Sequence, residues 1–147
     1  MKHFTRCVGL IIVVVLILSS SIFAAESVEP RGSYYFIRSG VYLYRENESD
    51  RTFAACFDVT GTHTMEKIGA KLLKIQRSSD GENWTTMRTY RMADYPEMIC
   101  ENTIQHDYYF YYTGTAGYYY RTYVELYAED SSGTGEWYKY SSSILLE

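Results

Sequence analysis

The sequence predicts an all-β fold, a single antiparallel β-sandwich of about seven strands preceded by a signal-peptide helix. The chain contains 17 tyrosines, all beyond the first 25 residues, and aromatic residues favour the half-buried surface of a pleated strand. Turn-forming residues divide the same region into short segments at regular spacing. Short strands with regular turns and a pair of cysteines are typical of extracellular sandwich domains.

Residues 1–25 have the three parts of a secretory signal peptide. A basic start precedes an unbroken apolar run, residues 10–18, and a small-residue cleavage pattern ends at Ala24. The apolar stretch is shorter than the roughly 20 residues that cross a bilayer comfortably. We therefore expect a secreted, extracellular protein with no stable membrane anchor after signal cleavage. Residues 26–147 are predicted to form the β-sandwich domain.

The first half of this domain is predicted to contain four strands. Asp80-Gly81 is a strong hairpin signal between the third and the fourth. Residues 65–73 are ambiguous, because their apolar spacing also suits a short helix, although Gly69 argues against one. The four predicted strands are residues 34–44, with a break at Ser39-Gly40, residues 52–60, residues 68–77 and residues 84–91.

The second half is predicted to contain the remaining strands. Residues 99–113 hold one or more strands around a Tyr-Tyr-Phe-Tyr-Tyr run, and residues 117–128 form the longest clear strand. Residues 137–145 close the domain after a turn at Gly133-Thr134-Gly135.

The candidate binding surface lies on the strand at residues 117–128. Because side chains alternate across a strand, its even-numbered residues are predicted to face the core and its odd-numbered residues to face outward. An outward tyrosine row suits stacking against sugars or docking of a protein. The alternative is cross-strand aromatic packing that stiffens the sheet. The candidate surface is Tyr119, Arg121, Tyr123, Tyr127 and Trp137, with a same-face pair predicted between Arg121 and Glu125.

Cys56 and Cys100 remain after signal cleavage, an even number in an oxidising compartment. A disulfide between them is therefore predicted. Closing this loop would stabilise the fold by about 4 kcal/mol in the chain-entropy model.

Catalytic, cofactor and metal sites are not expected. His63 and His106 lie outside any nucleophile or metal-helix motif, which favours surface roles for both. Asp80, Glu82 and Asn83 place three oxygen-bearing side chains close together, but turn chemistry explains them better than calcium. The formal net charge is −4, and it falls to about −6 without the leader, which disfavours nucleic acid as a partner.

Two stretches resemble known extracellular modules. Residues 75–84 (IQRSSDGENW) look like the strand, Asp-Gly hairpin and Trp of many extracellular sandwich domains. Thr122 stands where the corner tyrosine of fibronectin type III domains would be, with Tyr120 two residues earlier. The residues that resemble the late-strand pattern of that family are Val124, Leu126, Ala128, Asp130 and Gly133.

The whole arrangement is similar to small uncharacterised secreted proteins of Gram-positive bacteria with a fibronectin type III or immunoglobulin-like β-sandwich. This resemblance implies a compartment and a fold, and no activity. The function expected is a noncatalytic binding or interaction module for an unknown protein or glycan ligand, such as carbohydrate or a cell surface. The alternative is a secreted effector, such as a bacteriocin-like or envelope-active protein, and a hydrolase ranks third.

Overall fold

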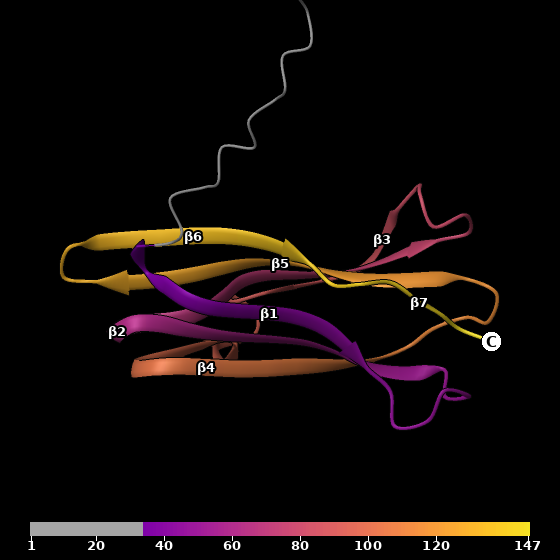
Figure 1. The fold of residues 1–147 in the computed structure, drawn as a ribbon, viewed down its shortest axis with the longest axis horizontal. Coiled ribbons are helices and arrows are strands. Elements are labelled where there is room, and N and C mark those ends of the chain that lie inside the picture. Colours follow the sequence, from indigo (N-terminus) through magenta and orange to yellow (C-terminus); the bar gives the residue numbers. More distant parts are fainter. Residues whose placement is uncertain (1–33) are drawn as a thin grey trace, which may run out of the picture.

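The computed structural model of the chain describes residues 34–147, so the predicted signal peptide at residues 1–25 lies outside the described residues. Most of the described chain is in strands that pair antiparallel with one another (Figure 1). A 3-10 turn, η2 (Pro96–Met98), precedes the fourth strand. The strands are β1 (Phe36–Tyr44), β2 (Thr52–Ser78), β3 (Thr85–Arg91), β4 (Ile99–Thr113), β5 (Tyr119–Asp130), β6 (Gly133–Tyr140) and β7 (Ile144–Leu145).

The 27-residue strand β2 organises the fold because its two halves pair with different neighbours. Its first half lies between β1 and β4. Its second half, from Lys67 onward, pairs with β5 on one side and with β3 on the other, while β6 and β7 extend the sheet from β5. The sheet therefore has a first layer of β1, β2 and β4 and a second layer of β3, β2, β5 and β6.

Gly69 lies where β2 passes from the first layer to the second. It pairs with Ile99 of β4 and with Tyr127 of β5. Its φ of +154° belongs to the region that favours glycine, and a Cβ there would overlap the carbonyl oxygen of Met98. β2 can make this transition because residue 69 has no side chain.

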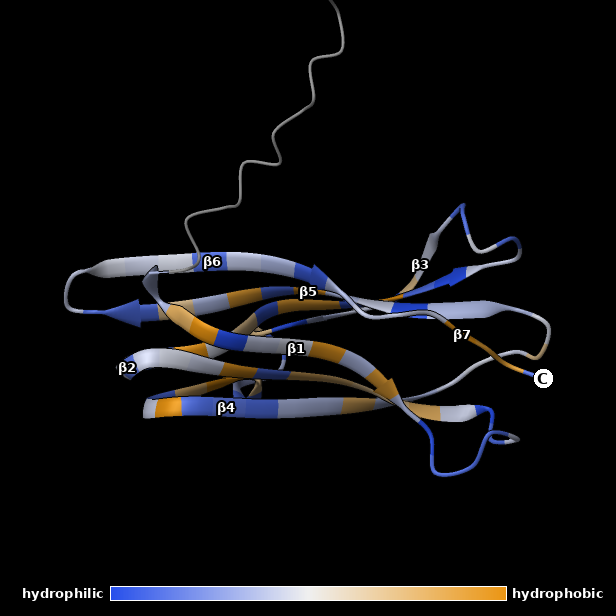
Figure 2. Ribbon diagram, viewed as in Figure 1, coloured by the Kyte–Doolittle hydropathy of each residue, from blue (hydrophilic) through white to orange (hydrophobic). Residues whose placement is uncertain are grey.

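The core lies between the two layers and takes apolar side chains from alternate positions of the strands. Figure 2 shows apolar and polar residues alternating along β1 and β5. Phe53 of the first layer and Tyr120 of the second have ring centroids 5.4 Å apart, so aromatic contacts join the layers. The predicted all-β, sandwich-like fold is confirmed. Its largest fully buried side chains include Phe53, Phe57, Met65, Ile68, Leu73, Ile75, Val124 and Leu126.

Three predicted element boundaries are wrong. Residues 65–73 are extended within β2, so the two strands predicted at 52–60 and 68–77 are one continuous strand and the helical alternative is excluded. The predicted break at Ser39-Gly40 is also absent, because β1 runs through it. Gly133-Thr134-Gly135 opens β6, and the preceding turn is at residues 131–132, where Asp130 pairs with Gly133.

The predicted Cys56–Cys100 disulfide is wrong, since both cysteines are free. Cys56 pairs with Tyr109 in the β2–β4 register, whereas Cys100 pairs with Ile68. Nine residues of β4 separate Tyr109 from Cys100, a length of about 30 Å at the rise of a strand. A disulfide requires Cα atoms within about 7 Å, so the register keeps the two thiols apart.

Within residues 34–147, no helix is long and apolar enough to cross a membrane.

Candidate ligand-binding face

The predicted surface on β5 is a real face of the sheet. Tyr119, Arg121, Tyr123 and Tyr127 are all half-buried and alternate with buried core residues, as the sequence pattern predicts. Trp137 is not part of this face. It pairs with Leu126, a core residue, and packs against the hydrophobic cluster on the inner side.

Arg121 lies between two aromatic rings on the outer side of the second layer. Its guanidinium carbon is 4.2 Å from the ring centroid of Trp84 and 4.4 Å from that of Tyr140. Its Nε–H donates to Oε1 of Gln76 at 2.8 Å. The predicted pair with Glu125 is therefore replaced by a cation–π sandwich that fixes the β2–β3 loop to β6.

The tyrosines of this face are also engaged by their neighbours. Tyr123 donates its hydroxyl to Oε1 of Glu125 at 2.9 Å, and Tyr127 donates to Oε2 of Glu129 at 2.6 Å. Burial and the neighbouring carboxylate raise the pKa of Tyr123 and of Tyr127 to about 12. Lys71 lies over the ring of Tyr127, 4.5 Å from its centroid. These contacts support the interpretation of this face as cross-strand packing that stiffens the sheet.

The outer side of the first layer carries a second set of tyrosines, which the sequence analysis did not identify. The β1–β2–β4 register places Tyr42 and Tyr109 on either side of Cys56, and Tyr44 and Tyr111 on either side of Ala54. All four tyrosines are exposed, from 46% for Tyr42 to 67% for Tyr111. We call Tyr42, Tyr44, Tyr109 and Tyr111 the tyrosine platform.

The tyrosine platform covers the middle strand. Cys56 and Ala54 point away from the core, yet they are only 8% and 4% exposed. Because the side chains beside them across the register are the four tyrosines, the rings lean over these small residues from both sides. Tyr109 and Tyr111 contact each other edge to face, with ring centroids 5.3 Å apart and ring planes at 74°, so the four rings form an uneven aromatic surface that faces solvent.

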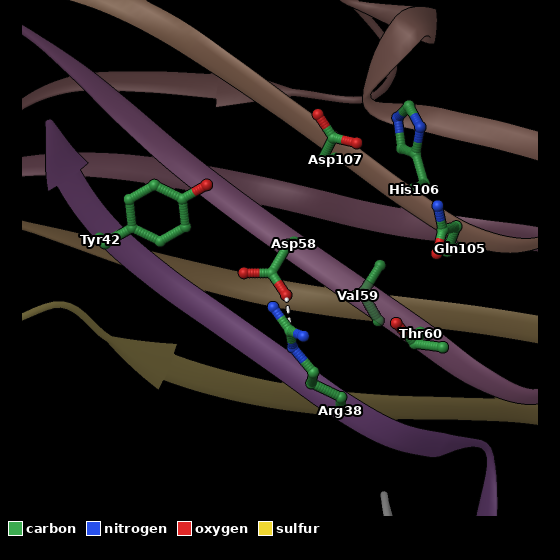
Figure 3. A pocket seen from close by; sticks show the side chains of 8 residues that line it. All are labelled: Arg38, Tyr42, Asp58, Val59, Thr60, Gln105, His106 and Asp107. Atoms are coloured by element: carbon green, nitrogen blue, oxygen red, sulfur yellow. Dashed lines mark ion pairs between the residues drawn. The ribbon is translucent and has the colours of Figure 1, made fainter.

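An acidic cavity of about 240 Å³ adjoins one end of the tyrosine platform (Figure 3). Asp58 of β2 and Asp107 of β4 are register partners on this face. Nε of Arg38 lies 3.5 Å from Oδ1 of Asp58. Figure 3 shows the Tyr42 hydroxyl directed toward the side of the cavity that holds the two carboxylates.

The electrostatics of this end are negative. Burial raises the pKa of Tyr42, and interactions with Cys56, Asp58 and Asp107 raise it further against the opposing effect of Arg38. Burial and the neighbouring Asp107 carboxylate raise the pKa of the Cys56 thiol to about 11. The thiol is therefore protonated at neutral pH and supplies an apolar floor rather than a nucleophile.

A second cavity, of about 150 Å³, lies at the other end of the tyrosine platform. Tyr44 and Tyr111 line it together with Glu46 and Asp50. Both ends of the aromatic surface thus carry carboxylates.

The histidines and the turn carboxylates lie apart from the tyrosine platform or point away from it. His63 donates from Nε2 to Oδ2 of Asp130 at 2.9 Å, and His106 donates from Nε2 to the carbonyl oxygen of Glu97 at 2.9 Å. Asp80 accepts hydrogen bonds from the backbone N–H groups of Glu82 and Asn83, which confirms the predicted turn chemistry. These side-chain and backbone hydrogen bonds lower the pKa of Asp80.

Within residues 34–147, no three His, Cys, Asp or Glu side chains are grouped so as to hold a metal ion.

No family model matches this chain, and no curated protein matches it. Among solved structures, it is similar to Spo0M, a sporulation control protein from Bacillus subtilis, with a TM-score of 0.43 and 12% sequence identity. The match covers 75% of this chain and 49% of the Spo0M chain, so this chain spans about half the length of that protein.

Proposed function

We propose that this protein is a secreted, noncatalytic binding module that holds a glycan on the tyrosine platform. The observation that carries the proposal is the set of four exposed tyrosines on either side of the buried residues Ala54 and Cys56. An exposed tyrosine ring offers an apolar face to a sugar ring and a hydroxyl group for a hydrogen bond.

The state of the tyrosines supports this face over the face on β5. The rings of Tyr123 and Tyr127 lie under lysines and their hydroxyls are bound to carboxylates of the same strand. Tyr44 and Tyr111 are 60% and 67% exposed, so a ligand can cover them without first displacing a neighbour. Covering exposed aromatic area stabilises a complex through the hydrophobic effect.

The cavity beside the tyrosine platform supports a small ligand group rather than a large one. Pockets for drug-sized molecules measure about 300–1,000 Å³, and this cavity measures about 240 Å³. It suits one sugar residue of a chain whose other residues stack along the rings. The leader predicted at residues 1–25 would deliver such a module to extracellular glycans.

A glycan-array screen of the purified protein tests this proposal. Tyr109→Ser/Tyr111→Ser removes two rings of the tyrosine platform, and Tyr138→Ser/Tyr140→Ser removes two rings from the opposite face. The pairs are matched in exposure, at 51% and 67% against 55% and 50%. Thermal melting checks that both variants remain folded.

We expect the first variant to lose about tenfold or more in affinity, because stacking of each ring contributes about 0.5–1.5 kcal/mol. The second variant should bind as the wild type does. Absence of glycan binding by the wild-type protein would contradict the proposal, and so would binding that only the second variant loses.

A further inference from the structure

The acidic end of the tyrosine platform has more negative than positive charge. Asp58 and Asp107 are directly opposite on neighbouring strands, where side chains on one face are in contact range. Arg38 and His106 also line this cavity, and the side chain of Arg38 is 76% exposed. Among the ion pairs formed by residues 34–147, none includes Asp107. Asp107 is exposed and lines the cavity, and its carboxylate has no cationic partner from the described chain.

The position of Asp58 follows from the glycine beside it. Gly40 is its register partner in β1, and a Cβ at residue 40 would overlap the Asp58 carboxylate. Because Gly40 has no side chain, the Asp58 carboxylate can lie over the backbone of β1. Tyr42 projects from the same face of β1. A negative charge is thus placed beside an aromatic ring.

A protonated amine satisfies both features of this end. It forms charge-assisted hydrogen bonds with carboxylates, and it can donate a further hydrogen bond to the Tyr42 hydroxyl, which is directed toward them. A neutral sugar hydroxyl gains less from the same carboxylates, since it carries no charge to offset theirs.

We propose that the glycan bound on the tyrosine platform is an amino sugar chain with free, protonated amino groups, one of which binds between Asp58 and Asp107 next to Tyr42. This inference rests on the proposed function, because it names the class of glycan. At the far end, Glu46 lines the second cavity and would meet a second amine of the same chain.

Two oligosaccharides that differ only in acetylation test the inference. The probes are β-1,4-linked glucosamine oligomers and the fully N-acetylated oligomers of the same length, titrated calorimetrically at about pH 5.5, where the free amino groups of the probe are protonated. We expect the free amine form to bind about tenfold or more tightly than the acetylated form. Its affinity should fall as salt is added, because the distinguishing contact is ionic.

Paired substitutions locate the contact. Asp58→Asn/Asp107→Asn keeps the size of both side chains and should make the two oligomers bind equally. The matched control, Glu125→Gln/Glu136→Gln, changes the net charge by the same amount on the opposite face and should keep the preference. Loss of preference in both variants would contradict a local site.

The outcomes separate this inference from the proposed function. Equal binding of both oligomers by the wild type would overturn the proposed recognition of an amine. It would leave the proposal that the tyrosine platform binds a glycan intact. Binding of neither, together with a blank array, would overturn both. If an oligolysine peptide bound as tightly as the amine oligomer and competed with it, the ligand class would be a cationic peptide and the glycan assignment would fall.

Discussion

The carboxylate of Asp58 lies over the backbone of Gly40, in the space that a Cβ at residue 40 would occupy. The two residues are register partners on β2 and β1. Arg38, on the same face of β1 two residues away, reaches Asp58 at 3.5 Å. The negative end of the tyrosine platform is therefore shaped by a strand residue that has no side chain.

Gly40→Ala is expected to displace the Asp58 carboxylate. Alanine is ordinarily better than glycine in a strand by roughly 0.5–1 kcal/mol, but here the new methyl group competes with Asp58 for the same space. The substitution should therefore fail to stabilise the wild-type protein. In an Asp58→Ala background the competitor is gone, and Gly40→Ala should stabilise by about 0.5–1 kcal/mol.

Urea unfolding of the wild type, the two single variants and the double variant measures this coupling as a double-mutant cycle. An effect of Gly40→Ala that is the same in both backgrounds would show that Asp58 is not the group that Gly40 accommodates.

Gly69→Ala is expected to destabilise the fold severely. Residue 69 combines a φ of +154° with a close approach to the carbonyl oxygen of Met98, and that carbonyl precedes β4 directly. A methyl group there can be accommodated only by separating β4 from β2. We expect a loss of more than about 3 kcal/mol.

Gly117→Ala is the matched comparison for Gly69→Ala. Gly117 also has a positive φ, of +82°, but a Cβ there would meet nothing within 4 Å. Gly117→Ala should therefore lower the free energy of unfolding by about 1–2 kcal/mol, from backbone strain alone. Similar urea midpoints for the two variants would refute the steric role assigned to Gly69.

The alternation of buried and half-buried residues along β5 is a part of the fold that could be predicted from the sequence. A period of two is a local property of the chain, so the buried and half-buried sides of residues 119–128 were predictable from residues alone. Trp137 was misplaced because the turn before it was set at Gly133–Gly135 instead of residues 131–132. The shift changed which residues of β6 were expected to share a face with Tyr123.

The tyrosine platform could not be assembled from the sequence, because it depends on register between distant strands. The local signal was present: Tyr42 and Tyr44 alternate with apolar residues, and Tyr109 and Tyr111 lie within an aromatic run. What joins the two pairs is the small middle residue Cys56, which pairs with both strands. The disulfide was predicted wrongly for the same reason, because the register of the strands was not known. An even number of cysteines does not show which thiols the strands bring within bonding distance.

Both thiols are expected to be free and to differ in reactivity. Cys56 is 8% exposed, and its pKa is raised from an ordinary 9.0 to about 11, so little thiolate is present at neutral pH. Cys100 is half-buried and should be alkylated first. Mass spectrometry after alkylation without reductant should show Cys100 modified quickly, and Cys56 modified only slowly until urea is added. A peptide pair linked through these two residues would contradict the β2–β4 register.

The stability of the folded protein is expected to fall at alkaline pH. Burial and neighbouring carboxylates raise the pKa of Tyr123 and of Tyr127 from 10.0 to about 12. Between these values the unfolded chain releases the phenolic protons and the folded chain retains them. The folded state then binds more protons, so the free energy of unfolding decreases as pH rises. The stability that these groups contribute is fully present below about pH 10 and is lost as pH rises toward about 12.

Thermal melting measured from about pH 8 to pH 12 tests this linkage with two variants. Tyr123→Phe/Tyr127→Phe removes the two hydroxyls that donate to Glu125 and Glu129, and should flatten the decline of Tm with pH. Tyr138→Phe removes a hydroxyl from an exposed ring on the same face, and should leave the slope unchanged. A double variant whose Tm falls as steeply as that of the wild type would mean that these hydroxyls titrate alike in the folded and unfolded chains. The hydrogen bonds to Glu125 and Glu129 would then not hold the phenolic protons, and the self-contained packing assigned to the β5 face would lose its support.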